Sequence, residues 1–386
     1  MSKRNTHPLG KPGKAAEAAL RAAGHAGLPP GSPALDRELF IGGGAFVDLK
    51  DQKTQRFVLS RVELDSQRVG LVPTTFLPHG VALDPRNPAR IIAFEKIGPG
   101  CCEIDLATGM PTRTIEPRED RWFYGHGAFS ADGRTLFSTE TVNSRESGVI
   151  GVRDADTLEY LGEFPTFGEN PHDCHLIDEG KVLVVTNGGG RAGTTLRPCV
   201  TYVDIASQRL LDKFELDDER FNTGHLALSQ SGILVVVSAP RKGMMLEKDL
   251  GAVSMRAADG PLRVMREPGD VAARMFGEAL SVKIHEPSGI AAVTHPFGGM
   301  VTFWSLEHLK LLKTIELQRA RGLTLSNDGR YFVISYDVTT ALALIDPYTL
   351  ELVADSGLTQ SFMSGSHLFN WNRLAGASLG TLRKAA

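Results

Sequence analysis

Histidines recur along this 386-residue chain, and several of them stand directly before or at the start of a short apolar run. Five occupy equivalent places: His79, His126, His172, His225 and His367. Imidazole nitrogens suit Fe, Cu, Zn and Ni, and such an ion needs several of them at one point. The residue types therefore predict a transition-metal site for Fe, Cu or Zn, with His295 or His175 as substitute ligands.

A second set of polar residues follows fourteen to sixteen positions after three of these histidines: Glu95, Glu140 and Asn187. In a pair of antiparallel strands, the start of the first strand and the end of the second lie at the same edge. Carboxylates and amides next to a ligating imidazole fix its tautomer and raise its basicity. We therefore expect these three side chains to support the metal ligands.

The histidines belong to a repeat that governs the fold. Each begins a unit made of a polar entry, a short strand, a turn of the Asp-Gly type and a second strand, and Ser281 and Gly322 occupy the same place in two further units. The seven anchors are 41 to 56 residues apart. About 40 to 50 residues per four strands is typical of a β-propeller blade. The sequence predicts an all-β chain folded as a seven-bladed β-propeller.

Ring closure and domain organisation can be predicted as well. Three strand-like runs, residues 39–41, 55–60 and 69–72, precede the first anchor, and one strand follows the last. One C-terminal inner strand and three N-terminal strands would complete one blade and close the ring. Residues 1–35 are rich in Gly, Pro, Ala and basic residues and predict a flexible tail with one short helix around 15–23. Residues 36–382 form a single propeller domain in this interpretation.

Composition excludes several classes of partner. The net charge of −3 and the pI near 6.4 argue against nucleic acid and anionic lipid. No apolar run is long enough to span a membrane, and no export signal is evident, so the residues alone predict a cytoplasmic protein. The four cysteines lack a CxxC spacing and predict free thiols. We expect a monomer that binds a small ligand or an unidentified protein partner.

No catalytic residue is predicted, because the chain has no GxSxG, P-loop, HExxH or dinucleotide-binding motif. The leading hypothesis is a non-catalytic or weakly redox-active propeller that binds a metal or a metal-bearing ligand at a histidine-lined channel mouth. One alternative is a protein-interaction scaffold that uses outer blade edges or residues 241–271, a long charged region with few strand signals. Another is a lactonase-like hydrolase in which Glu95, Glu140 and Asn187 hold Ca²⁺.

Several motifs also resemble one protein family. They are FYGHGAFSADG at residues 123–133, GVIGVRDA at 148–155, GEF at 162–164, NPHD at 170–173 and NGG at 187–189. Together they resemble a bacterial family, a domain of unknown function often encoded beside imelysin-type iron-uptake proteins, with the clearest match over about residues 76–240. The resemblance implies a WD40-like or YVTN-like seven-bladed propeller, export to the periplasm and a link to iron acquisition. It brings no established catalytic residues, and its histidine motifs match His79, His126, His172 and His225.

Overall fold

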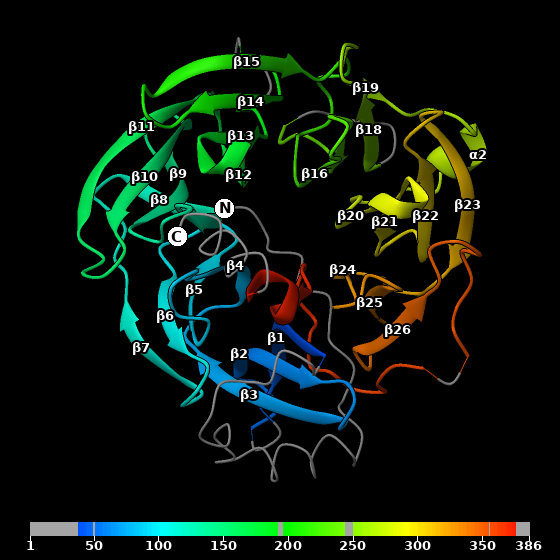
Figure 1. The fold of residues 1–386 in the computed structure, drawn as a ribbon, viewed down its shortest axis with the longest axis horizontal. Helices are drawn as coiled ribbons and strands as arrows, with labels where there is room; N and C mark the ends of the chain where they lie inside the picture. Colours follow the sequence, from blue (N-terminus) through cyan, green and yellow to red (C-terminus); the bar gives the residue numbers. More distant parts are fainter. Residues whose placement is uncertain (1–37, 49–50, 192–195, 244–249, 355, 376–386) are drawn as a thin grey trace.

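Seven small sheets stand around a central channel in the computed structural model, which describes residues 38–48, 51–191, 196–243, 250–354 and 356–375 (Figure 1). This is the predicted seven-bladed β-propeller. The predicted tail 1–35, with its short helix, lies outside the described residues. No helix within the described ranges is long and apolar enough to cross a membrane.

Each blade is an antiparallel meander whose first strand lines the channel. Blade 1 contains β4 (Pro78–Leu83), β5 (Arg90–Glu95), β6 (Cys101–Asp105) and β7 (Met110–Thr114). Blade 2 contains β8 (Arg121–Phe129), β9 (Thr135–Val142), β10 (Ser147–Asp154) and β11 (Tyr160–Glu169). Blade 3 contains β12 (Pro171–Ile177), β13 (Val182–Asn187), β14 (Cys199–Asp204) and β15 (Arg209–Glu215).

The second half of the ring repeats this arrangement, except that the sheet of blade 6 has three strands. Blade 4 contains β16 (Leu226–Leu228), β17 (Leu234–Ser238), β18 (Ala252–Arg256) and β19 (Arg263–Val264). Blade 5 contains β20 (Val282–His285), β21 (Ile290–His295), β22 (Met300–Ser305) and β23 (Lys310–Glu316). Blade 6 contains β24 (Leu323–Leu325), β25 (Phe332–Tyr336) and β26 (Ala341–Ile345). Short helices in the described part of the chain include η1 (Asp178–Gly180), η2 (Glu286–Ser288) and α2 (Gly269–Ala272), and residues 371–375 are helical as well.

Blade 7 joins the two parts of the chain that close the ring. Its order is β27 (Phe369–Asn370), β1 (Leu39–Val47), β2 (Gln55–Glu63) and β3 (Arg68–Thr74), so one C-terminal inner strand adds to three N-terminal strands as predicted. The ladder between β27 and β1 pairs Phe40 with Asn370 and Ile41 with Phe369.

The hydrophobic core lies between neighbouring blades. In β5, Ile91 and Ala93 pack towards blade 7, whereas Ile92 and Phe94 pack towards blade 2. Successive side chains of a strand point to opposite faces, so a strand between two neighbours is apolar at nearly every position. This explains why the second strands of the blades read as continuous apolar runs.

Hydroxyl side chains on the second strands join each blade to the next. Thr139 Oγ1 accepts from the His126 amide and lies in hydrogen-bond range of the carbonyl oxygens of His126 and His172. Thr186 and Thr294 occupy equivalent places: each accepts an inner-strand amide and donates to a carbonyl of the next blade. These hydroxyls hold the starts of neighbouring inner strands at a fixed spacing around the channel.

Residues 241–271 differ from the expectation of a long region with few strands. The described part of this region contains β18 and β19, the two outer strands of blade 4, together with α2. Both strands are short, which is why their pattern is weak in the sequence. Part of the region thus belongs to blade 4, and residues 244–249 lie outside the description.

Candidate functional site

The five predicted histidines meet at one end of the channel, where each stands at or directly before an inner strand. The β-ladder register shifts at three of them, between Pro78 and Gly80, between Phe123 and Gly127, and between Pro171 and Cys174. Such irregularities re-aim side chains next to functional sites. Here they accompany imidazoles that turn into the channel. We call His79, His126, His172, His225 and His367 the imidazole cluster.

Four Nε2 atoms of the imidazole cluster converge. The His172 and His225 Nε2 atoms are 2.9 Å apart, and those of His225 and His367 are 2.8 Å apart. His79 Nε2 lies 3.1 Å from that of His172 and 3.2 Å from those of His225 and His367. Ligands at right angles on an ion with bonds of about 2.0 to 2.1 Å are about 2.9 Å apart, and tetrahedral ligands about 3.3 Å. The observed separations have this scale.

Hydrogen bonds on the opposite side of three rings define their tautomers. His172 Nδ1 lies 2.8 Å from the carbonyl oxygen of Tyr124, and His225 Nδ1 lies 2.7 Å from that of Leu280. A carbonyl oxygen only accepts, so both Nδ1 atoms carry the proton. In a neutral imidazole, Nε2 is then an unprotonated acceptor. The two Nε2 atoms therefore face each other with lone pairs.

His367 has the same arrangement through a side chain. Ser281 Oγ donates to the Ser366 carbonyl oxygen at 2.9 Å and lies 3.3 Å from His367 Nδ1. Because the Ser281 hydroxyl proton is donated to Ser366, the Ser281 oxygen can only accept from His367 Nδ1. The Nε2 atom of His367 is then left as an acceptor. Three converging nitrogens thus present lone pairs to one another at close range.

His126 lies at the side of this group. Its ring centroid is 4.9 to 5.4 Å from those of the other four histidines. Its Nδ1 is 3.5 Å from Asp173 Oδ1, and its buried Nε2 makes no hydrogen bond to any described residue. One ligand atom each from His79, His126, His172 and His225 lies within 4.8 Å of the others. His126 is thus close to the convergence point and has a free nitrogen.

Protonation is disfavoured throughout the imidazole cluster. Burial is the largest cause and lowers the pKa of His79, His172, His225 and His367 well below the ordinary histidine value, and neighbouring imidazoles lower it further. Burial lowers the pKa of His126 to about 4, although Asp173 opposes the shift. Near neutral pH the imidazoles are therefore neutral, which is the form that binds metal ions.

The three predicted supporting residues engage other partners. Glu95 accepts from the Gly100 amide at 2.9 Å. Glu140 is fully buried and pairs with Arg153 at 2.6 Å. The Asn187 amide donates to Thr201 Oγ1 at 3.0 Å. Within the described ranges, neither glutamate belongs to a group of three or more His, Cys, Asp or Glu side chains suited to hold a metal.

The two substitute histidines also have other surroundings. His175 Nε2 lies 3.1 Å from Asp173 Oδ2, and His295 Nε2 lies 2.9 Å from Thr302 Oγ1 inside blade 5. Asp173 is the buried neighbour of the imidazole cluster that sequence reasoning missed: it lies directly after His172, and its Oδ2 also accepts from the Leu226 amide at 3.1 Å. Burial alone would raise the pKa of Asp173, but His175 and His126 outweigh it and hold the pKa well below its usual range. The PHD motif was the available signal.

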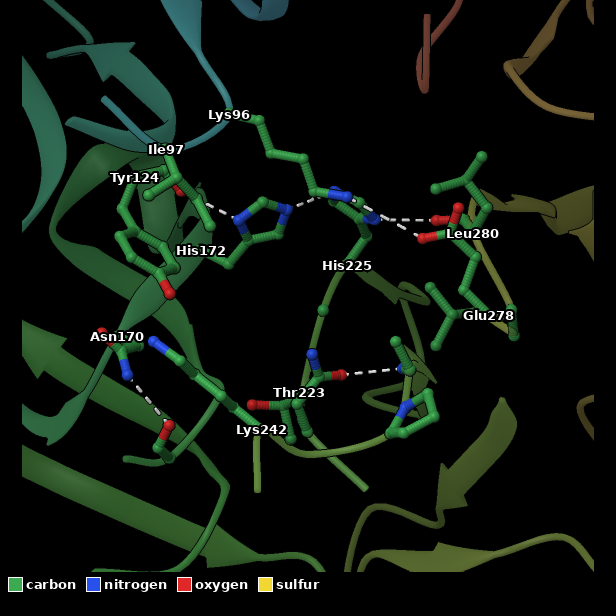
Figure 2. A pocket seen from close by; sticks show the side chains of 18 residues that line it. Lys96, Ile97, Tyr124, Asn170, His172, Thr223, His225, Lys242, Glu278 and Leu280 are labelled. Carbon is green, nitrogen blue, oxygen red and sulfur yellow. Dashed lines mark hydrogen bonds and ion pairs between the residues drawn. The ribbon is translucent and has the colours of Figure 1, made fainter. Parts of the chain in front are cut away.

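A cavity of about 240 Å³ opens beside the imidazole cluster, and His172 and His225 form part of its wall (Figure 2). Lys96, in the loop after β5, lies over these two rings and reaches Glu278 of the loop before β20 at 3.8 Å. Tyr124, Asn222 and Lys242 also line the cavity. Two residues of the imidazole cluster, His172 and His225, therefore border this cavity.

Comparison with known proteins supports the fold and places the chain in a family. No curated protein matches it. Among solved structures, Kuenenia stuttgartiensis hydrazine synthase is similar in fold, with 16% identity, a TM-score of 0.60 and coverage of 77% of this chain and 93% of that chain. At this identity the likeness concerns the fold alone. Residues 73–356 match the family described as "Protein of unknown function (DUF1513)", and the chain belongs to this family of seven-bladed β-propellers.

Proposed function

We propose that this propeller binds a divalent first-row transition-metal ion through the imidazole cluster. The observation that carries the proposal is the facing pair of unprotonated Nε2 atoms of His172 and His225, 2.9 Å apart, with both Nδ1 protons donated to carbonyl oxygens. Two lone pairs at this distance repel each other unless a cation lies between them. Because burial disfavours a proton there, a metal ion is the cation that fits.

The ligand type narrows the choice of metal. An all-imidazole site suits Zn, Cu, Ni and ferrous Fe, whereas Mg²⁺ and Ca²⁺ require oxygen ligands. Asp173 places one negative charge beside His126 and partly balances the charge of a bound ion. A role in iron acquisition, which the resemblance to an iron-associated family suggests, belongs to this proposal if the ion is Fe²⁺.

The test is metal binding by chelator-treated protein, followed by calorimetry and by elemental analysis after gel filtration. We expect one tightly bound Cu²⁺, Zn²⁺, Ni²⁺ or Fe²⁺ per chain and no binding of Ca²⁺. His172→Ala and His225→Ala should abolish stoichiometric binding. His308→Ala is the matched control, because His308 is an exposed histidine in the turn between β22 and β23. If the wild-type protein and the two cluster variants bind the metals equally, the proposal is wrong.

The anaerobic comparison of Fe²⁺ with Zn²⁺ and Cu²⁺ decides the iron assignment. Affinity for an all-nitrogen site normally rises from Fe²⁺ to Cu²⁺. An Fe²⁺ affinity within tenfold of that for Zn²⁺ would support a role with iron, whereas a preference that follows the general order would favour Cu²⁺ or Zn²⁺.

A further inference from the structure

We infer that the cavity beside the imidazole cluster binds a small oxyanion, either an organic carboxylate or an inorganic anion. The inference rests on the proposed function and deepens it, since such an anion would lie next to the metal. The charged side chains that line the cavity are present with or without the metal. The cavity volume of about 240 Å³ is slightly below the range of roughly 300 to 1,000 Å³ that is typical of drug-sized ligands. Its occupant is therefore small.

The charges that line the cavity are predominantly positive. Lys96 and Lys242 contribute two positive charges and Glu278 one negative charge, so the net charge of the lining is 2 − 1 = +1 with neutral imidazoles. Glu278 is partly neutralised by Lys96 at 3.8 Å. Lys242 is exposed at the rim and forms no ion pair with a described residue. A net positive lining of this kind favours the binding of an anion.

Two uncharged polar side chains in the wall, Tyr124 and Asn222, can donate hydrogen bonds into the cavity. Asn222 Oδ1 accepts from the Ala239 amide at 2.8 Å, which leaves the Asn222 amide group to donate into the cavity. The Tyr124 hydroxyl makes no hydrogen bond to any described residue and lies in the cavity wall (Figure 2). A phenol hydroxyl can donate a hydrogen bond, so Tyr124 offers a donor to a ligand in the cavity.

These donors share the cavity with two residues of the imidazole cluster. His172 and His225 line the same cavity, and Lys96 lies above them (Figure 2). An oxyanion in the cavity would accept hydrogen bonds from Lys96, Lys242, Tyr124 and Asn222 and place an oxygen towards the imidazole nitrogens. Carboxylates and phosphates both have this chemistry.

The experiment measures succinate and phosphate binding by calorimetry, with the full chain in metal-free and Zn²⁺-loaded forms at constant ionic strength. We expect millimolar or tighter binding of at least one anion to the metal-free protein and tighter binding to the Zn²⁺-loaded protein. Preference for succinate would identify an organic carboxylate as the ligand, and preference for phosphate an inorganic oxyanion.

Three variants test whether side chains that line the cavity bind the anion. Lys96→Gln and Lys242→Gln should each weaken anion binding about tenfold, and Asn222→Asp should abolish it, because it keeps the acceptor for Ala239 and replaces the donor with a negative charge. Lys310→Gln, on the exposed strand β23, is the control and should bind as the wild type does. Thermal midpoints confirm that each variant folds.

Failure of this inference can be separated from failure of the proposed function. If Zn²⁺ binds but neither anion does, or if the three cavity variants bind anions as the wild type does, the inference is overturned and the metal proposal stands. If Zn²⁺ does not bind but the metal-free protein binds an anion through Lys96 and Lys242, the inference stands and the metal proposal fails.

Discussion

His126 and Asp173 come from neighbouring blades, and the imidazole Nδ1 lies 3.5 Å from the carboxylate Oδ1. Asp173 follows His172 directly, so one carboxylate lies between two members of the imidazole cluster in different blades. It is buried and also accepts from the Leu226 amide at the start of blade 4. This carboxylate places a negative charge next to an otherwise neutral group of imidazoles.

Asp173→Asn should weaken metal binding about 10- to 100-fold, the usual effect of removing a group that supports a metal ligand. The variant keeps the side-chain shape but loses the charge beside His126. Calorimetric titration with Zn²⁺ measures the change. Asp218→Asn is the control, because Asp218 pairs with Arg220 and Arg266 in blade 4, and its loss should affect stability and leave Zn²⁺ affinity unchanged. Equal Zn²⁺ affinities for wild type and Asp173→Asn would contradict the prediction.

Gly125→Ala should impair metal binding through sterics. Gly125 has φ +118°, and an added Cβ would lie 2.8 Å from His172 Cε1 and 3.1 Å from His79 Cδ2. We expect at least tenfold weaker Zn²⁺ binding and a loss of about 1 to 2 kcal/mol in the free energy of unfolding. Gly109→Ala is the matched control: it also has positive φ, +68°, but an added Cβ meets nothing within 4 Å. The control should lose stability and keep its Zn²⁺ affinity.

The buried pair of Glu140 and Arg153 should contribute to stability and leave metal affinity unaffected. Arg153 lies over the rings of Phe123 and Tyr160, with its Cζ 5.1 and 5.4 Å from their centroids. Glu140→Gln or Arg153→Met leaves an uncompensated buried charge and should cost about 3 to 5 kcal/mol, whereas the double variant should recover part of the loss. Urea unfolding measures these values. If Glu140→Gln loses Zn²⁺ binding and retains stability, Glu140 supports His126 after all.

Glu103 should make stability depend on pH. Burial alone would raise its pKa, but hydrogen bonds from Arg113, Thr112 and Arg90 outweigh burial and lower the pKa to about 2. The folded-state pKa is thus below the ordinary value, so the contribution is complete above about pH 4.5 and is lost as the pH falls towards 2. Glu103→Gln should lower the urea midpoint at pH 7, and the difference from wild type should shrink between pH 4.5 and 3. A difference that is constant with pH would argue against this ion-pair role.

The spacing of the repeats predicts the fold and the meeting of the histidines, because equivalent positions in successive blades lie around one axis. The partners of Glu140 were not predictable in the same way. Reasoning from strands one and two alone paired Glu140 with His126, whereas its ion-pair partner is Arg153 on the third strand. Side chains alternate between sheet faces, and one face of β9 packs into the blade interface. The tautomers of His172 and His225 could not be predicted from the sequence either. They depend on backbone carbonyl oxygens, of Tyr124 and Leu280, which every residue type has.

A hydroxyl pattern was present in the sequence and could have been used. Thr139 lies thirteen residues after His126, Thr294 thirteen after Ser281 and Ser335 thirteen after Gly322. Each accepts the amide of the anchor residue, so the spacing reflects a physical contact between the first two strands of a blade. At Thr139 and Thr294 the same hydroxyl also reaches a carbonyl oxygen of the next blade, so this spacing marks the blade-to-blade hydrogen bonds there.

The pairing of β27 with β1, which closes the ring, lies close to the imidazole cluster, so a bound ion would affect how the ring opens. β27 and β1 pair at only two positions, yet His367, just before β27, lies 3.2 Å from His79 of blade 1, which is 288 residues away in the chain. An ion bound by both His367 and His79 would hold the two ends of the chain together at this closure. Opening the ring would then require breaking metal–ligand bonds, so a bound ion would slow the unfolding of the protein.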